Sequence, residues 1–133
     1  ARIVGVDAEG SILKEWFEDG TMGVPHGYKV EGFGEDFIPP ATDFSVIDEI
    51  RMVDDEMCFR MARRLAKQEG LFCGGSCGGA LKVALDIAAE YDKAGKKAKI
   101  VVILPDAGNP YLGKVYNDDW LRDNGFDVDG WAW

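Results

Sequence analysis

A glycine-rich run at positions 74–79, Gly-Gly-Ser-Cys-Gly-Gly, decides more of the expected fold than any other feature of the chain. It follows a short apolar segment, residues 71–73, and precedes a helical pattern that we expect from about Ser76 to Tyr91. Bare backbone at a helix start permits close helix–strand packing, and it also lets a ligand reach the helix N-terminus. Ser76 is therefore either the cap of its own helix or a ligand-binding residue. The spacing does not separate a phosphate from a heteroaromatic ring.

Apolar patterns on both sides of this run predict an α/β fold in three layers, with a mostly parallel sheet flanked by helices. Residues 2–6 and 47–53 are typical of strands, and residues 100–104 form the continuous apolar run of a parallel strand buried on both faces. Asp54 is a good N-cap for a helix that ends at Gly70. The broad apolar face of the helix after the glycine-rich run predicts packing on a sheet.

The segment from residue 9 to residue 42 carries no sustained periodicity and is dense in glycine, proline and aromatic residues. Such a long irregular stretch is usually functional or covered by a partner. Within it, Gly32-Phe33-Gly34 predicts either a tight turn with Phe33 in the core or a loop that lies close to a small substrate.

Two further residues have competing interpretations. Asp106 follows the apolar run 100–104, so it either caps the next turn or belongs to an active site at the end of a strand. His26 has no evident partner, so we expect it on the surface. Beyond Asp106 we expect short helices and loops.

Composition and cysteine spacing exclude several classes of function. Asp and Glu number 24 against 15 Lys and Arg, and this net charge of −9 disfavours binding to nucleic acid. No apolar run approaches the roughly 20 residues that a membrane span requires. The odd set Cys58, Cys73 and Cys77, without a secretory signal, predicts reduced thiols in the cytoplasm. Cys73 and Cys77 lack a second close cysteine pair and a nearby histidine, so we expect no metal site.

Four segments occur in an order and at a spacing that resemble the C-terminal part of the catalytic core of the cystathionine β-synthases. The cysteine synthases of the same pyridoxal-phosphate fold type II resemble it somewhat less. The resemblance covers the chain from about Arg2 to Phe126. The segments are residues 5–11 (GVDAEGS), 30–34 (VEGFG), 69–76 (EGLFCGGS) and 102–106 (VILPD).

This resemblance implies that Ser76 hydrogen-bonds the ring nitrogen of pyridoxal phosphate, which favours the ring over the phosphate. It also implies that Gly32 and Gly34 line the amino-acid side of the site. A neutral hydroxyl at a helix N-terminus does not favour a protonated ring nitrogen. The cofactor would then be a moderate electron sink, suited to loss of a β-substituent and addition of a nucleophile.

The chain also departs from the family pattern. The Schiff-base lysine, the ring-stacking asparagine and the phosphate loop of the family all belong upstream of this segment, so we expect no catalytic residue here and no activity of the segment alone. Glu35 stands where cystathionine β-synthases typically carry tyrosine. Cys77 replaces a small residue, and Asn109-Pro110 replaces Arg-Asn.

The sequence thus predicts one partial domain, residues 1–133, of a cytoplasmic pyridoxal-phosphate lyase of amino-acid biosynthesis. The complete enzyme would make cystathionine, or cysteine, from serine or an activated serine and a thiol. Its expected partners are amino-acid substrates, the remainder of the catalytic core and a second subunit in a homodimer. The alternative is a non-catalytic fragment or binding module without the Schiff-base lysine. A dinucleotide-binding half domain is disfavoured, because the glycine register is not G-x-G-x-x-G.

Overall fold

The sheet of this protein consists of two parallel strands in the part of the chain that the computed structural model describes, residues 1–131. β1 (Val4–Ala8) pairs with β2 (Glu49–Val53) along its whole length. Both strands overlap the predicted segments 2–6 and 47–53. Residues 132 and 133 of the predicted domain lie outside the described residues.

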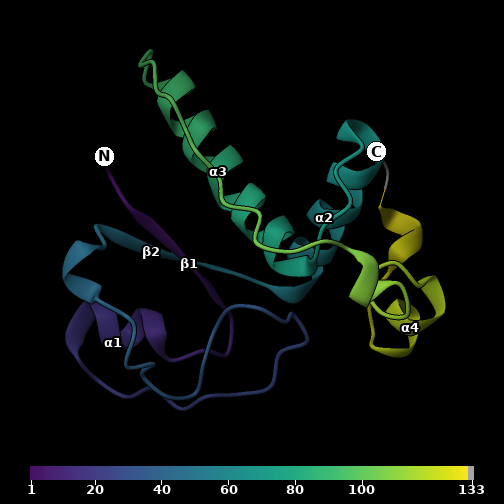
Figure 1. Ribbon diagram of the computed structural model, residues 1–133, viewed down its shortest axis with the longest axis horizontal. Helices are drawn as coiled ribbons and strands as arrows, with labels where there is room; N and C mark the ends of the chain where they lie inside the picture. Colours follow the sequence, from purple (N-terminus) through teal and green to yellow (C-terminus); the bar gives the residue numbers. More distant parts are fainter. Residues whose placement is uncertain (132–133) are drawn as a thin grey trace.

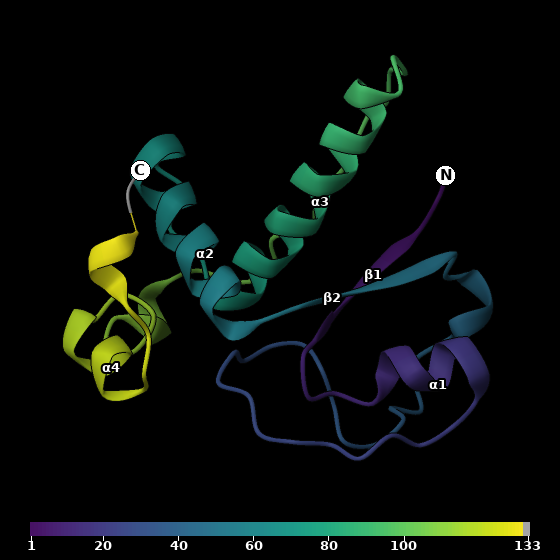
Figure 2. The ribbon, with the colours of Figure 1, turned by 180° about the vertical axis from the view of Figure 1, so that it is seen from behind.

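Helices flank the sheet on both sides, which confirms the predicted α/β class with a parallel sheet (Figure 1). α1 (Leu13–Asp19) contacts β2, and α3 (Gly75–Lys93) contacts both strands from the opposite side. α2 (Asp55–Glu69) packs against α3, and the two helices diverge from a common corner in a V shape (Figure 2). None of the helices in the described residues has the length and apolar character of a membrane span.

The predicted helix after Asp54 forms as expected, because its signals are local. Asp54 is the N-cap, and its carboxylate accepts a hydrogen bond from the backbone N–H of Met57 at 2.7 Å. Gly70 ends the helix in the left-handed conformation with φ of 70°. The helix buries a stripe of five residues, Cys58, Phe59, Met61, Ala62 and Leu65.

The glycine-rich run serves a helix–helix contact more than the predicted helix–sheet contact. A Cβ on Gly78 would overlap the carbonyl oxygen of Cys58 and lie 2.6 Å from the backbone nitrogen of Ala62. Only a residue without a side chain permits this approach of α3 to α2. Packing of α3 on the sheet is limited, since most of its contacts are with α2 and Leu85 is exposed.

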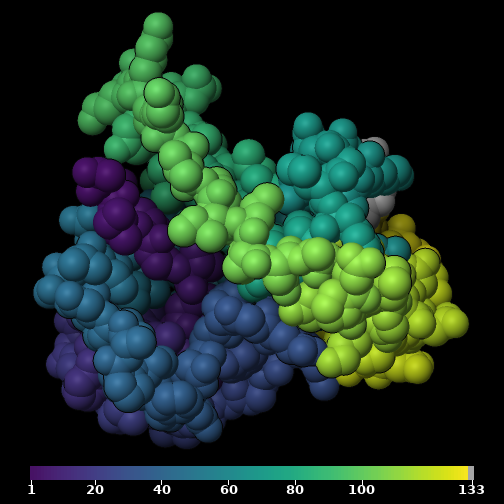
Figure 3. Space-filling view, viewed as in Figure 1, coloured from purple at the N-terminus to yellow at the C-terminus, as the bar shows by residue number. Residues whose placement is uncertain are grey.

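The predicted strand at residues 100–104 does not form. The segment runs back along α3 without a strand partner among the described residues, and Figure 3 shows it lying on the surface of that helix. Val101 is 84% exposed and Ile103 is 77% exposed. A strand needs a neighbouring strand for its backbone groups, and an apolar sequence alone does not supply one. The expectation of burial on both faces was therefore wrong for this segment.

The sequence pattern also missed α1, a helix of seven residues within the irregular segment 9–42. Leu13, Trp16 and Phe17 give it a short apolar stripe at helical spacing. Its start is fixed from outside the helix, because the buried carboxylate of Asp7 accepts a hydrogen bond from the backbone N–H of Lys14 at 2.9 Å. A tertiary contact of this kind leaves no local signal.

The C-terminal part forms short helices and turns, as expected. Two 3₁₀ helices, η2 (Asn109–Tyr111) and η3 (Val128–Gly130), flank α4 (Asp118–Asp123). A third, η1 (Phe44–Val46), precedes β2. The C-terminal part docks on α2 through edge-to-face contacts of Phe59 with Trp120 and Phe126, at centroid distances of 5.9 and 5.3 Å.

The close approach at Gly78 predicts the effect of a single methyl group. Gly78→Ala should lower the free energy of unfolding by about 1–3 kcal/mol, because the backbones of α2 and α3 must separate to admit it. Urea denaturation measures this loss. Gly113→Ala is the matched control, since a Cβ on Gly113 meets nothing within 4 Å. Equal stability of the two variants would contradict the packing described here.

Candidate cofactor-binding site

Ser76 lies in the first turn of α3, and the structure excludes the interpretation of Ser76 as the helix cap. Gly74 is the N-cap and makes no side-chain hydrogen bond, so Ser76 is the second helical residue and not the cap. The residue is only 5% exposed, and its Oγ has no hydrogen-bond partner among the described residues. An unpaired buried hydroxyl costs about 1–3 kcal/mol, so it is a feature that requires an explanation.

The structure brings Gly32 against this hydroxyl. A Cβ on Gly32 would lie 3.0 Å from Ser76 Oγ and 3.3 Å from Ser76 Cβ. Gly32 and Gly34 have φ of 99° and 80°, a region that residues with side chains rarely adopt. The turn therefore presents bare backbone to the Ser76 hydroxyl.

The second glycine of the turn is equally crowded. A Cβ on Gly34 would lie 2.8 Å from the hydroxyl oxygen of Tyr28 and 3.0 Å from Ala8 Cβ. Phe33 packs against the core, and its ring lies about 3 Å from the place of a Cβ on Gly79. The tight turn with a core aromatic is thus present.

Asp106 lies beside the first turn of α3 and does not cap the next helical turn. Its Oδ1 accepts a hydrogen bond from Cys77 Sγ at 3.3 Å, and its Oδ2 accepts one from the Tyr111 hydroxyl at 2.6 Å. η2 begins after Gly108 without a side-chain cap. The capping interpretation of Asp106 was therefore wrong, and its carboxylate belongs to the surroundings of Ser76.

The thiols and phenol around Asp106 are neutral hydrogen-bond donors. Burial raises the pKa of Cys73 to about 12 and raises the pKa of Cys77 above its usual value. The hydrogen bond to Asp106 raises the pKa of Tyr111 to about 12. Because the thiolate is the reactive form of cysteine, the raised pKa of these two thiols disfavours their reactive form.

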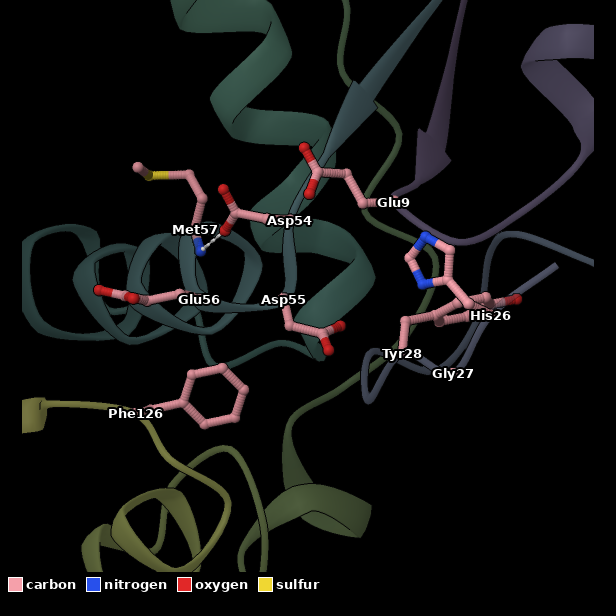
Figure 4. A pocket seen from close by; sticks show the side chains of 9 residues that line it. All are labelled: Glu9, His26, Gly27, Tyr28, Asp54, Asp55, Glu56, Met57 and Phe126. Atoms are coloured by element: carbon pink, nitrogen blue, oxygen red, sulfur yellow. Dashed lines mark hydrogen bonds between the residues drawn. The ribbon is translucent and has the colours of Figure 1, made fainter. Parts of the chain in front are cut away.

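An open cleft of about 470 Å³ lies near the carboxyl ends of both strands and was not predicted (Figure 4). Glu9 and Asp54 directly follow β1 and β2. Their position at the carboxyl ends of parallel strands is the sequence signal that could have predicted this cleft. Three of the carboxylates accept hydrogen bonds: Asp54 caps α2, Asp55 accepts from two backbone N–H groups at 2.6 and 2.7 Å, and Glu56 accepts from the indole N–H of Trp131 at 3.2 Å. The lining residues are Glu9, His26, Gly27, Tyr28, Asp54, Asp55, Glu56, Met57 and Phe126.

His26 is exposed at the edge of this cleft, as predicted for a surface residue. Within residues 1–131, no three side chains of His, Cys, Asp or Glu are grouped as a metal ion would require. Ser76 does not line this cleft, nor a second one of about 490 Å³ bordered by α2 and α3. The acidic cleft and the Ser76 site are therefore separate features.

Residues 1–106 match the family described as pyridoxal-phosphate dependent enzyme. The chain belongs to this family. Cystathionine beta-synthase of Dictyostelium discoideum is 46% identical over 124 residues, and that of Mus musculus is 44% identical over 125 residues. These matches cover 93% and 94% of this chain but only 24% and 22% of the relatives. The chain thus spans about a quarter of the length of these curated relatives.

Solved structures of the pyridoxal-phosphate family agree with the fold. The O-acetylserine dependent cystathionine beta-synthase of Helicobacter pylori matches 87% of this chain with a TM-score of 0.71 and 37% identity. The cysteine synthase of Entamoeba histolytica matches 86% with a TM-score of 0.71 and 34% identity. The match covers 35% and 32% of those chains. The resemblance inferred from the four motifs, and the fold type II class that it implies, are confirmed.

The conformation of Gly32 yields a second prediction. Gly32→Ala should destabilise the protein more than Gly20→Ala. Both positions have positive φ, a conformation that costs a residue with a side chain about 1–2 kcal/mol. Only at position 32 does the new methyl group also contact another residue. Urea denaturation of the two variants measures the difference, which isolates the contact with Ser76. Equal losses would mean that the turn is not pressed against that hydroxyl.

Proposed function

We propose that this chain forms the part of a pyridoxal-phosphate β-replacement enzyme that holds the pyridine ring of the cofactor. The observation that carries the proposal is the buried Oγ of Ser76, which has no partner among residues 1–131 in a chain of this family. The complete enzyme would join serine or an activated serine to a thiol and produce cystathionine or cysteine. Relatives named cystathionine beta-synthase and cysteine synthase support this reaction class.

Bound pyridoxal phosphate would supply the electron sink for loss of a β-substituent and addition of a nucleophile. Ser76 would hold the ring nitrogen through its hydroxyl, which would then gain the hydrogen bond that it lacks. The N-terminus of α3 carries partial positive charge, so this position disfavours a protonated ring nitrogen. Ser76 would therefore donate a hydrogen bond from its hydroxyl to a neutral ring nitrogen.

Gly32 and Gly34 would shape the amino-acid side of the site. Both lack the Cβ that would fill the space against Ser76 and Tyr28. Glu35 follows this turn, and its backbone is fixed by Ser11, whose hydroxyl accepts from Glu35 N at 3.0 Å and donates to Glu35 O at 3.1 Å. A carboxylate at this position would influence the choice between thiol substrates.

The remainder of the catalytic core would be the first partner of residues 1–133, which make up one partial domain. Residues 100–104 are extended, apolar and without a strand partner among the described residues, and strands of that remainder would pair with them. The segment alone would be inactive, because the Schiff-base lysine belongs to the remainder. We also propose a cytoplasmic homodimer for the complete enzyme, and the three free cysteines support a reducing compartment.

The ring-binding role predicts the behaviour of two substitutions in the complete enzyme. Ser76→Ala should weaken cofactor binding roughly tenfold, since one hydrogen bond to the ring is lost. Ser76→Asp should shift the cofactor absorbance and lower turnover, because a carboxylate favours a protonated ring nitrogen. Absorbance spectra, cofactor titration and product formation measure these effects. Ser45→Ala removes an exposed hydroxyl and is the control; unchanged spectrum and turnover in both Ser76 variants would remove Ser76 from the site.

The non-catalytic alternative rests on the absence of the Schiff-base lysine motif from residues 1–133. Intact mass and colour of the purified natural protein distinguish the two. A much heavier yellow protein is the expected result. A species near 14.6 kDa that stays colourless with added pyridoxal phosphate would instead support a binding module.

A further inference from the structure

Asp106 forms a hydrogen-bonded cluster that the proposed function does not use. Its carboxylate accepts from the Cys77 thiol on one oxygen and from the Tyr111 hydroxyl on the other. Cys77 immediately follows Ser76 in α3, and its side chain is fully buried. The cluster therefore joins the loop after residue 105 to the helical turn that carries Ser76.

The carboxylate also lies directly against the N-cap of α3. A Cβ on Gly74 would overlap Oδ1 of Asp106, lie 2.7 Å from Oδ2 and lie 2.7 Å from Cε2 of Tyr111. A helix N-terminus attracts negative charge, because its first N–H groups are unpaired. Asp106 is thus held at this place both by its hydrogen bonds and by the field of the helix.

The same loop reaches the other side of the Ser76 hydroxyl. Lys114 forms an ion pair with Glu31, the residue before Gly32. The Tyr116 hydroxyl donates a hydrogen bond to the carbonyl oxygen of Cys73 at 2.6 Å, just before the N-cap. Residues 106–116 therefore hold both the first turn of α3 and the turn that faces Ser76.

The geometry points to Asp106 as a positioning residue that fixes the first turn of α3, and with it the direction of the Ser76 hydroxyl toward the cofactor ring. Asp106 does not contact Ser76 through a hydrogen bond; it acts through Cys77 and through its contact with Gly74. The inference rests on the proposed function, because the orientation of Ser76 matters only if its hydroxyl binds the cofactor ring. A carboxylate is suited to this task because its two oxygens accept from two donors at once.

The test compares Asp106→Ala with Ser76→Ala in the complete enzyme, with two readouts. Hydrogen exchange of the amides of residues 75–79, measured without cofactor, reports on the helical turn itself. The absorbance maximum and dissociation rate of bound pyridoxal phosphate report on the ring. We expect Asp106→Ala to speed exchange and cofactor release by about tenfold each. Ser76→Ala should change the cofactor readouts and leave exchange within twofold.

Matched variants separate this role from general destabilisation. The double variant Cys77→Ala/Tyr111→Phe keeps the carboxylate and removes both donors, so it should reproduce the Asp106→Ala result. It also replaces Asp106→Ala if that variant does not fold. Asp106→Asn retains one acceptor oxygen, so its amide exchange and cofactor release should be faster than in the natural protein but slower than in Asp106→Ala. Asp119→Asn makes the same chemical change on a side chain that is 93% exposed and should alter neither readout.

The outcomes distinguish the two proposals. If Asp106→Ala and the double variant leave the cofactor readouts unchanged while Ser76→Ala alters them, Asp106 has no positioning role and the proposed function stands. Faster exchange with an unchanged cofactor spectrum would likewise overturn the role of Asp106, because the turn would then move without consequence for the ring. If Ser76→Ala leaves the spectrum unchanged, the proposed function itself fails.

Discussion

The backbone contact between α2 and α3 is the constraint on which the rest of the site depends. The backbone of Gly78 packs against the carbonyl oxygen of Cys58, and this close contact buries the first turn of α3 in the core. Gly75 then packs against Phe59 and Val30, at 3.2 Å from the place where its Cβ would be. As a consequence, Ser76 is buried even though it is only the second residue of its helix.

The acidic composition of the chain has a structural use that its net charge does not reveal. Carboxylates repeatedly accept hydrogen bonds from backbone N–H groups that have no partner in a strand or helix: Asp7 holds the start of α1, Asp54 caps α2, and Asp55 fixes the chain before the glycine turn. Each of these bonds stabilises an irregular or terminal stretch of backbone. Part of the negative charge therefore orders irregular backbone, including the chain before the glycine turn.

Against this background of satisfied polar groups, the Ser76 hydroxyl is conspicuous. In the described part of the chain, the buried side-chain atoms without a partner are Ser76 Oγ and Arg63 Nη1. The guanidinium of Arg63 still pairs with Asp118 and lies over the ring of Trp131. The hydroxyl of Ser76 has no such compensation, and a ligand of the pyridoxal-phosphate family offers the atom that would supply it. Under the proposed function, this one group would link the packing of α3 to the cofactor of the family.

The sequence by itself determined the elements whose signals are local, together with the family. α2 follows from its cap, its apolar stripe and Gly70, and the four motifs identified the family because motif order does not depend on side-chain contacts. Only the tertiary structure decided that Gly32 meets Ser76, that Asp106 binds Cys77 and that residues 100–104 lie exposed. These features depend on groups far apart in the chain, and neither hydrophobic periodicity nor residue spacing encodes which distant backbone will lie beside them.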